Sequence, residues 1–209
     1  MATSFFMNYK GKLLETVPSM NGWCDPAKSN HIFDSVVKQR ATTCVELGVF
    51  AGRSFVAFAL ALAALGEEGS VAYGVDTWAA SPAVANNEGE NAAWWRGIDY
   101  PAMYNECHQT CGKLGVLNYT KLLKMSTVDA YHEIKGPVDV LHIDGNHSQW
   151  DSTRDVALWV DRVSPNGLVY FDDEDWASTK MAQELLMTKC TKIEELKTTN
   201  VCGVYRKNG

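Results

Sequence analysis

From residue 41 onward, short runs rich in valine, leucine and isoleucine alternate with longer amphipathic or wholly apolar stretches. The runs predict strands over Thr43–Leu47, 70–75, 119–124, 138–143 and 168–171, and the stretches predict helices over 53–65, 102–114, 127–134, 152–163 and 178–189. Apolar strands that alternate with helices are typical of a parallel sheet covered on both faces. The hydrophobic pattern therefore predicts an α/β protein.

The end of the chain follows a different pattern. Residues 192–207 contain two strand-like runs separated by Thr198-Thr199-Asn200, which reads as an antiparallel hairpin. Five strand-helix units and this hairpin predict a Rossmann-like sandwich with a mostly parallel, seven-stranded sheet. We expect one domain over 1–209, with helical decoration over 1–40 and a candidate lid over 79–104.

The composition of the chain indicates which classes of binding partner it favours. The chain has 209 residues, 46% of them hydrophobic, a formal net charge of -6 and a pI near 5.4. An acidic protein is a poor ligand for nucleic acid or an anionic membrane surface, so we expect neither and favour a small-molecule partner. The longest apolar stretch, Phe55–Leu65, is too short to span a bilayer, and residues 1–12 lack a secretory signal pattern. We therefore expect a cytoplasmic protein and leave a homo-oligomer open.

The six cysteines do not form a zinc motif. Only Cys107 and Cys111 are close in sequence, and no second ligand pair has a comparable spacing. We expect buried thiols instead.

The first segment with candidate ligand-binding residues is 44–54, Cys-Val-Glu-Leu-Gly-Val-Phe-Ala-Gly-Arg-Ser. Gly48 and Gly52 follow a predicted strand and precede a helix, where glycine allows unusual backbone angles and close approach to a ligand. Glu46, two residues before the first glycine, could accept a hydrogen bond from a ligand amine. The spacing differs from the Gly-x-Gly-x-x-Gly of dinucleotide-binding folds.

Acidic residues lie at the carboxyl ends of four of the five predicted parallel strands: Glu46, Asp76, Asp144, and the pair Asp172 and Asp173. Ligands of open α/β sheets bind beyond the carboxyl ends of the strands. Helix capping explains one or two such residues, but five carboxylates on one edge would repel each other without cations or hydroxyls. Asp76 is placed to accept hydrogen bonds from ribose hydroxyls.

Several motifs together resemble a known family. The glycine segment, Gly-Val-Asp-Thr-Trp at 74–78, His-Ile-Asp-Gly-x-His at 142–147 and the Asp-Asp pair after a Pro-x-Gly turn occur in order over about 43–175. They are similar to class I S-adenosylmethionine methyltransferases, in the group of small metal-dependent O-methyltransferases of the macrocin and mycinamicin type and cephalosporin-hydroxylase-like proteins. The resemblance implies methyl transfer to a small hydroxylated substrate.

The resemblance also implies roles for individual residues. Asp76 would hold the ribose of S-adenosylmethionine, and Asp144, Asp172 and Asp173 match the positions that hold Mg²⁺. His147 matches the proposed general base. The remaining cofactor residues would border the amino-acid part or the adenine: Glu46, Gly48, Gly52, Ser54, Trp78, Ser126 and Asp144.

Structural alternatives remain for the metal and base residues. Consecutive strand residues point to opposite faces, so Asp172 and Asp173 can share an ion only if the strand has already ended. One of these carboxylates could instead cap the next helix, and His147 could be a simple loop or cap residue. His142, inside a strand, fits a core or sheet-face position better than a ligand position.

The predicted lid is rich in aromatic residues, including Trp94, Trp95 and Tyr100. They could stack on a substrate ring, pack against the body of the protein, or contact a second subunit. Trp150 and Trp176 flank the predicted metal loops and could form pocket walls.

Three other functions compete with O-methylation. The same fold could carry non-methylating chemistry, or bind the cofactor without catalysis. A nicotinamide-dependent oxidoreductase is disfavoured by the glycine spacing and the C-terminal hairpin.

Overall fold

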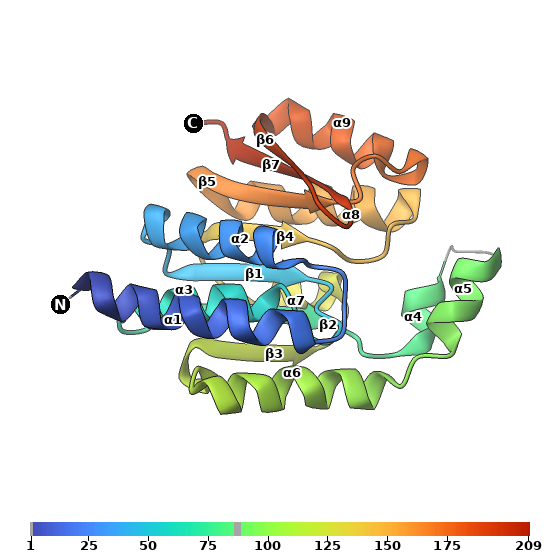
Figure 1. Ribbon diagram of the computed structural model, residues 1–209. Coiled ribbons are helices and arrows are strands. Elements are labelled where there is room, and N and C mark those ends of the chain that lie inside the picture. Colours follow the sequence, from blue (N-terminus) through green and yellow to red (C-terminus); the bar gives the residue numbers. More distant parts are fainter. Residues whose placement is uncertain (1, 86–88) are drawn as a thin grey trace.

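A computed structural model describes the backbone of residues 2–85 and 89–209, and the side chains of 6–85 and 92–209. Within this part of the chain, seven strands form one sheet in the order β3-β2-β1-β4-β5-β7-β6 (Figure 1). The first five are parallel where they pair, and β7 is antiparallel to both β5 and β6. The predicted sheet and its C-terminal hairpin are confirmed. The strands are β1 (Thr43–Leu47), β2 (Val71–Asp76), β3 (Thr120–Lys124), β4 (Val138–Ile143), β5 (Val163–Asp172), β6 (Cys190–Lys197) and β7 (Val201–Lys207).

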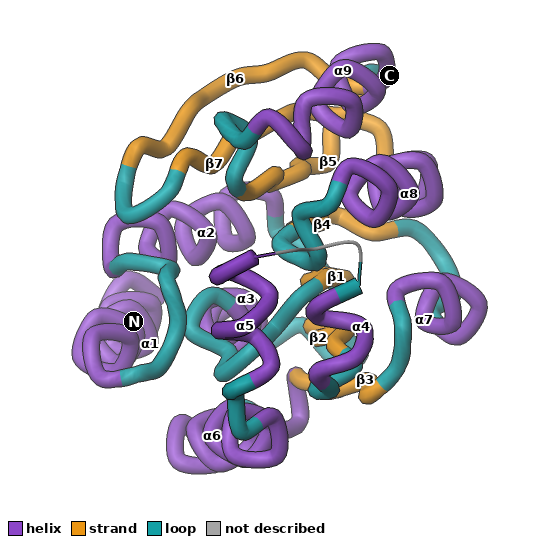
Figure 2. The backbone as a smooth tube through the Cα atoms, turned by 90° about the vertical axis from the view of Figure 1, so that its right-hand side faces the viewer, coloured by secondary structure: helices purple, strands orange, loops and turns teal. Residues whose placement is uncertain are grey.

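Helices cover both faces of the sheet (Figure 2). One face carries α1 (Ala2–Thr16), α2 (Pro26–Gln39), α3 (Phe55–Leu65) and α6 (Tyr100–Leu114). The other carries α7 (Thr127–Glu133), α8 (Gln149–Trp159) and α9 (Lys180–Lys189). Short 3₁₀ turns at 17–19, 117–119, 160–162 and 177–179 join these elements.

The apolar segment Phe55–Leu65 forms the most buried helix, α3. Every residue from Phe55 to Ala64 is buried, because both α1 and α2 pack against the side of α3 that faces away from the sheet. This enclosure explains why the helix is apolar on all sides rather than along one stripe. Residues before 41, expected to be helical, form α1 and α2 and complete this layer.

The structure differs from the predictions in two places. Within 77–101, for which we predicted no helix, α4 (Ala80–Val84) and α5 (Gly89–Arg96) form and project beyond the carboxyl ends of the strands (Figure 1). Residues 86–88 lie outside the described residues. Helix α6 begins at Tyr100 because Asp99 accepts a hydrogen bond from the Ala102 amide and Pro101 suits a first turn.

Strand β5 is also longer than predicted. It begins at Val163 and includes the 164–167 turn signal, where the pairing with β4 shifts register. Asn166 has a positive φ of 64°, which shows that the turn chemistry acts as a local irregularity within the strand.

The six cysteines are buried and free, as expected. Among the described helices, none has the length and apolarity that crossing a membrane requires.

Candidate functional site

A cavity of about 820 Å³ opens at the carboxyl edge of the sheet. Its wall comes from the loops after β1 to β5, the loop before α2, the helices α4 and α5, and the turn of the β6–β7 hairpin. The volume lies in the upper part of the roughly 300–1,000 Å³ that small-molecule sites occupy. The strand ends that the sequence singled out therefore meet at one cavity.

The glycine segment forms the turn between β1 and α3. Gly48 and Gly52 have φ values of 86° and 85°, which lie in a region that favours glycine over residues with a side chain. A Cβ on Gly48 would lie 2.0 Å from the carbonyl oxygen of Asp144, and one on Gly52 would lie 2.5 Å from Cys107 Sγ. Gly48 lines the cavity, whereas Gly52 lets the turn pack against α6.

Glu46 lies fully buried beneath this turn. Its Oε1 accepts hydrogen bonds from Ser54 Oγ and from His142 Nδ1, the latter at 2.8 Å, whereas its Oε2 is buried without a hydrogen-bond partner. Ser54 lines the cavity, but Glu46 is not among the lining residues. His142 lies opposite Glu46 on the neighbouring strand, so it occupies the sheet-face position that we expected.

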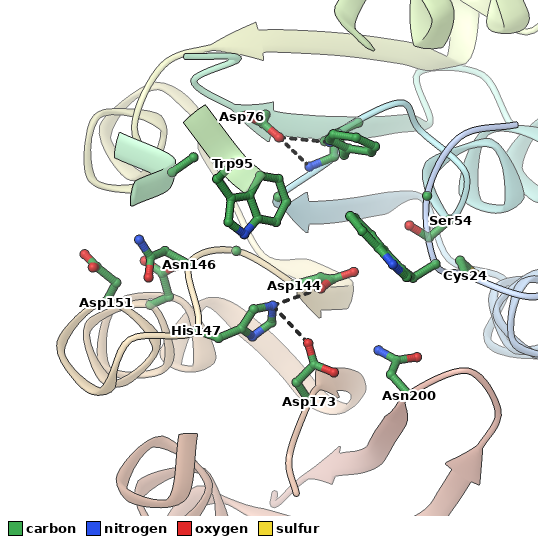
Figure 3. Close-up of a pocket in the computed structure, with 18 of the residues that line it drawn as sticks. Cys24, Ser54, Asp76, Trp95, Asp144, Asn146, His147, Asp151, Asp173 and Asn200 are labelled. Carbon is green, nitrogen blue, oxygen red and sulfur yellow. Dashed lines mark hydrogen bonds and ion pairs between the residues drawn. The ribbon is translucent and has the colours of Figure 1, made fainter. Parts of the chain in front are cut away.

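Asp76, at the end of β2, organises the loops around it. Its Oδ2 accepts hydrogen bonds from the amides of Val49 and Phe50, both at 2.9 Å, and its Oδ1 accepts one from the Trp78 amide at 2.8 Å. Asp76 lines the cavity, and its bonds to the turn after β1 are drawn in Figure 3. The carboxylate thus holds the β1 and β2 loops together at the predicted ribose position.

Of the two residues expected near the adenine, one lines the cavity and the other lies behind its wall. Ser126 lines the cavity and also caps α7, where its Oγ accepts a hydrogen bond from the Asp129 amide at 3.1 Å. Trp78 is buried behind the wall: its indole N–H donates to the Phe50 carbonyl at 2.7 Å and its ring packs edge-on against Tyr104. Trp78 therefore supports the wall rather than lining it.

Asp144, His147 and Asp173 meet at the cavity (Figure 3). His147 Nε2 lies 3.2 Å from Asp173 Oδ2 and 3.5 Å from Asp144 Oδ1. Asp173 has a φ of 50°, because the chain turns out of β5 there, and this turn points its carboxylate toward His147. An imidazole between two carboxylates can hold a proton in a cavity open to a ligand.

The environment shifts the pKa values of these three groups. Desolvation and the nearby Asp172 charge raise the pKa of Asp144 to about 7. Burial alone would lower the pKa of His147, but its contact with Asp144 outweighs burial and raises it. Burial likewise raises the pKa of Asp173. All three shifts favour the protonated form of the group.

Asp172, the remaining predicted metal residue, points into the protein. Its side chain is 1% exposed; its Oδ2 accepts hydrogen bonds from Lys28 Nζ and from Asn200 Nδ2, and its Oδ1 lies 3.5 Å from His142 Nε2. The three predicted metal residues thus fall into two groups, one with His147 at the cavity and one with His142 beneath it. Asp172 is the last residue of β5, and the chain turns at Asp173, so the two side chains leave the backbone in different directions.

Electrostatics fix the charges in the buried group. Burial alone would lower the pKa of Lys28, but the Asp172 carboxylate raises it well above its usual range. Burial and Lys28 would both lower the pKa of His142, yet Asp172 and Glu46 outweigh them and raise it to about 9. These shifts favour the cationic forms of Lys28 and His142, and the Lys28 charge holds the pKa of Asp172 well below its usual range.

Aromatic rings form part of the cavity wall. The rings of Trp23, Phe50, Trp94 and Trp95 cluster with centroids 4.8–6.3 Å apart. Trp176 lies on the other side, 5.3 Å from the His147 ring. Trp94, Trp95 and Tyr100 therefore line the cavity, whereas Trp150, also expected there, is not among the lining residues and is 70% exposed.

Sequence reasoning missed Lys28, Trp23 and Asn200. A helix start was visible at Asp25-Pro26, since Asp25 caps α2 by accepting from the Lys28 amide at 2.8 Å. Nothing local shows that the first turn of α2 reaches the end of β5, 144 positions away. Trp23 and Asn200 are brought together by the Thr199 hydroxyl, which donates to the Trp23 carbonyl.

Known proteins resemble this chain in sequence and in structure. A family model described as a methyltransferase domain matches residues 45–174. The uncharacterized protein y4gI of Sinorhizobium fredii (strain NBRC 101917 / NGR234) is 28% identical over 137 residues, which is 65% of this chain and 13% of that protein. The chain therefore spans a small part of that relative's length.

Two solved structures illustrate the shared fold. The O-methyltransferase NovP is 14% identical, with 100% of each chain covered and a TM-score of 0.76. The O-methyltransferase TomG from Streptomyces achromogenes, involved in tomaymycin synthesis and in complex with SAM, is 12% identical, with 98% of this chain and 90% of TomG covered and a TM-score of 0.65. At these identities the likeness establishes the fold.

Proposed function

Because this chain belongs to the methyltransferase-domain family, we propose that it transfers the methyl group of S-adenosylmethionine to a hydroxyl oxygen of a small molecule. The observation that carries this proposal is the position of His147. It lies between Asp144 and Asp173 in the wall of the cavity into which the β1 glycine turn also opens. A proton acceptor and a cofactor turn thus share one space.

The cofactor is proposed to lie along the β1 and β2 ends. The buried Oε2 of Glu46 has no hydrogen-bond partner, which fits the ammonium group of S-adenosylmethionine beside Gly48 and Ser54. Asp76 Oδ1 accepts one amide bond and has a lone pair left for a ribose hydroxyl. Ser126 would lie near the adenine. Trp78 and Gly52 would act indirectly, by supporting the turn.

His147 is proposed as the general base. Its Nε2 would accept the proton of the substrate hydroxyl while the oxygen attacks the sulfonium methyl; the carbon–sulfur bond breaks, and a neutral thioether leaves. Asp144 and Asp173 would stabilise the imidazolium that forms. Since the base must be unprotonated and its pKa is raised, the rate should increase as pH rises through that pKa.

Magnesium is proposed only as an ion held by Asp144 and Asp173. Both carboxylates face the cavity, and a hard divalent ion prefers such oxygens, so two of the three predicted ligands fit. When bound, the ion would lower the pKa of the substrate hydroxyl. Asp172 fits less well, because two cationic side chains already face its oxygens.

The acceptor is proposed to be a small molecule with an apolar or ring-shaped body. The cavity is large enough for a nucleoside cofactor and a small second ligand together. Trp23, Trp94 and Trp95 on one side and Trp176 beside His147 would enclose that body.

The test is transfer of a labelled methyl group from S-adenosylmethionine to a panel of hydroxylated acceptors. His147→Ala should slow transfer by about 100-fold or more and leave affinity for S-adenosylhomocysteine within about threefold, since a base acts in the chemical step. His132→Ala, at an exposed position of α7, is the matched control and should change neither.

Each alternative function predicts a different outcome. Wild-type transfer by His147→Ala would remove its role as base. Cofactor binding without transfer to any acceptor would favour a non-catalytic module or another reaction on the same fold.

A further inference from the structure

Lys28 is a buried cation in an unusual position. Its side chain is 1% exposed and lies in the first turn of α2, where the positive end of the helix dipole opposes a positive charge. Lysine is almost never fully buried unless it is paired. A specific anion must therefore hold it there, and that anion is Asp172.

The ion pair belongs to a row of alternating charges beneath the cavity. Glu46 faces His142 at 2.8 Å, His142 faces Asp172 at 3.5 Å, and Asp172 accepts from Lys28. Asn200 donates to the same oxygen of Asp172 as Lys28 does, at 3.1 Å. Oδ2 of Asp172 therefore already binds two donors of this chain, whereas its buried Oδ1 has no hydrogen-bond partner and faces only His142 Nε2, at 3.5 Å.

The carboxylates at the cavity are different. Asp144 and Asp173 line it, and the cationic group within 4 Å of both carboxylates is the imidazole of His147, which has no fixed positive charge. If a divalent ion entered from the cavity, it could take the place of the proton on the His147 imidazole. No buried charge would then be left without a partner. At Asp172 the same ion would have to compete with an ammonium group fixed to a helix.

We propose that the ammonium group of Lys28 stands in for a metal contact at Asp172, so that a divalent ion is held by Asp144 and Asp173 and not by Asp172. The inference refines the metal part of the proposed function. It predicts a weak divalent site in the natural chain, because ion affinity depends on the number of charged ligands. It also predicts that removing the ammonium group frees a third carboxylate and strengthens the site.

The test is Mn²⁺ binding to the full chain, measured by electron paramagnetic resonance, which needs neither acceptor nor turnover. Lys28→Met keeps most of the apolar stem and removes the charge. It should bind Mn²⁺ at least about tenfold more tightly than the natural chain, and the added substitution Asp172→Asn should abolish that gain. A folded Lys28→Met protein whose affinity stays within about twofold of the natural chain would overturn the proposal.

A second pair of variants keeps the test decisive if Lys28→Met does not fold. In the natural chain, Asp173→Asn should weaken Mn²⁺ binding by about tenfold, and Asp172→Asn should change it by less than about twofold. Equal losses from both variants would show that Asp172 is a ligand despite Lys28. Because all these readouts are binding constants, failure here leaves the proposal of methyl transfer standing and separately testable.

Discussion

Replacing Gly48 by alanine should disrupt the site through a backbone collision. Gly48 follows β1 directly with a φ of 86°, and its amide donates to the Val75 carbonyl at 2.8 Å. An added Cβ would lie 2.0 Å from the carbonyl oxygen of Asp144 and 2.8 Å from Gly145 Cα. Both neighbours are backbone, so no side-chain rotation relieves the contact. The end of β4, which carries Asp144, must move.

The size of the effect follows from this geometry. A non-glycine residue with positive φ costs about 1–2 kcal/mol. Reaching an ordinary contact distance requires a separation of roughly 1.4 Å, which also stretches the 2.8 Å hydrogen bond from the Asp144 amide to Leu47. Losing that bond adds about 1 kcal/mol, and a displacement of about 1 Å near the reacting groups can cost about 100-fold in rate.

The assay combines urea unfolding with calorimetric binding of S-adenosylhomocysteine. Gly48→Ala should lose about 2–3 kcal/mol of unfolding free energy and bind the ligand at least about tenfold more weakly. Gly66→Ala is the matched control, because Gly66 also has a positive φ, 66°, but an added Cβ there meets nothing within 4 Å. It should lose about 1–2 kcal/mol and bind normally. Gly48→Ala behaving like Gly66→Ala would refute the reasoning.

Two further predictions concern the cavity wall and the buried charge row. Trp23→Ala removes ring contacts with Phe50, whose ring centroid is 5.4 Å away, and with Trp94, at 5.1 Å. The affinity for acceptor or cofactor, measured by calorimetry, should therefore fall about three- to tenfold, whereas the exposed control Trp150→Ala should leave it unchanged. Equal losses of affinity in the two variants would contradict the assignment of Trp23 to the cavity wall. Burial alone would lower the pKa of His142, but the two neighbouring carboxylates raise it from 6.5 to about 9. Because the pKa of His142 is higher in the folded than in the unfolded chain, its protonation adds about 3 kcal/mol to the unfolding free energy below pH 6.5. This contribution is lost as pH rises through about 9, and roughly 2 kcal/mol of the loss falls between pH 7 and 9. The difference in unfolding free energy between wild type and His142→Asn should therefore shrink by roughly 2 kcal/mol from pH 7 to pH 9. A difference that stays constant over this pH range would show that His142 is not charged.

Much of the fold was predictable because local signals agreed with the tertiary structure. Each parallel strand contains a short apolar run and has a charged residue at its last position or next to it, and the antiparallel hairpin has its own turn signal at 198–200. The helices within 79–104 were not predictable. Short helices there depend on packing at the cavity mouth, and an Ala-, Asn- and Gly-rich composition does not distinguish them from a loop.

The site was predictable only as far as strand ends define it. Asp144, His147 and Asp173 come together because the loops after β4 and β5 meet at one edge of the sheet. Asp172 was assigned to the same group from the family resemblance, but its side chain is buried against Lys28, whereas the positive φ of Asp173 directs that carboxylate to the cavity. Contacts between segments that are far apart in the chain leave no periodic pattern in the sequence. The buried pair of Lys28 and Asp172 could therefore not be found without the structure.

The most direct test is calorimetric titration of the purified chain with S-adenosylhomocysteine, with NAD as a parallel ligand. The account predicts saturable binding of S-adenosylhomocysteine, one molecule per chain, and no binding of NAD. Binding of NAD, or no binding of S-adenosylhomocysteine, would contradict the assignment of the Glu46-to-Ser54 turn as a methyl-donor site.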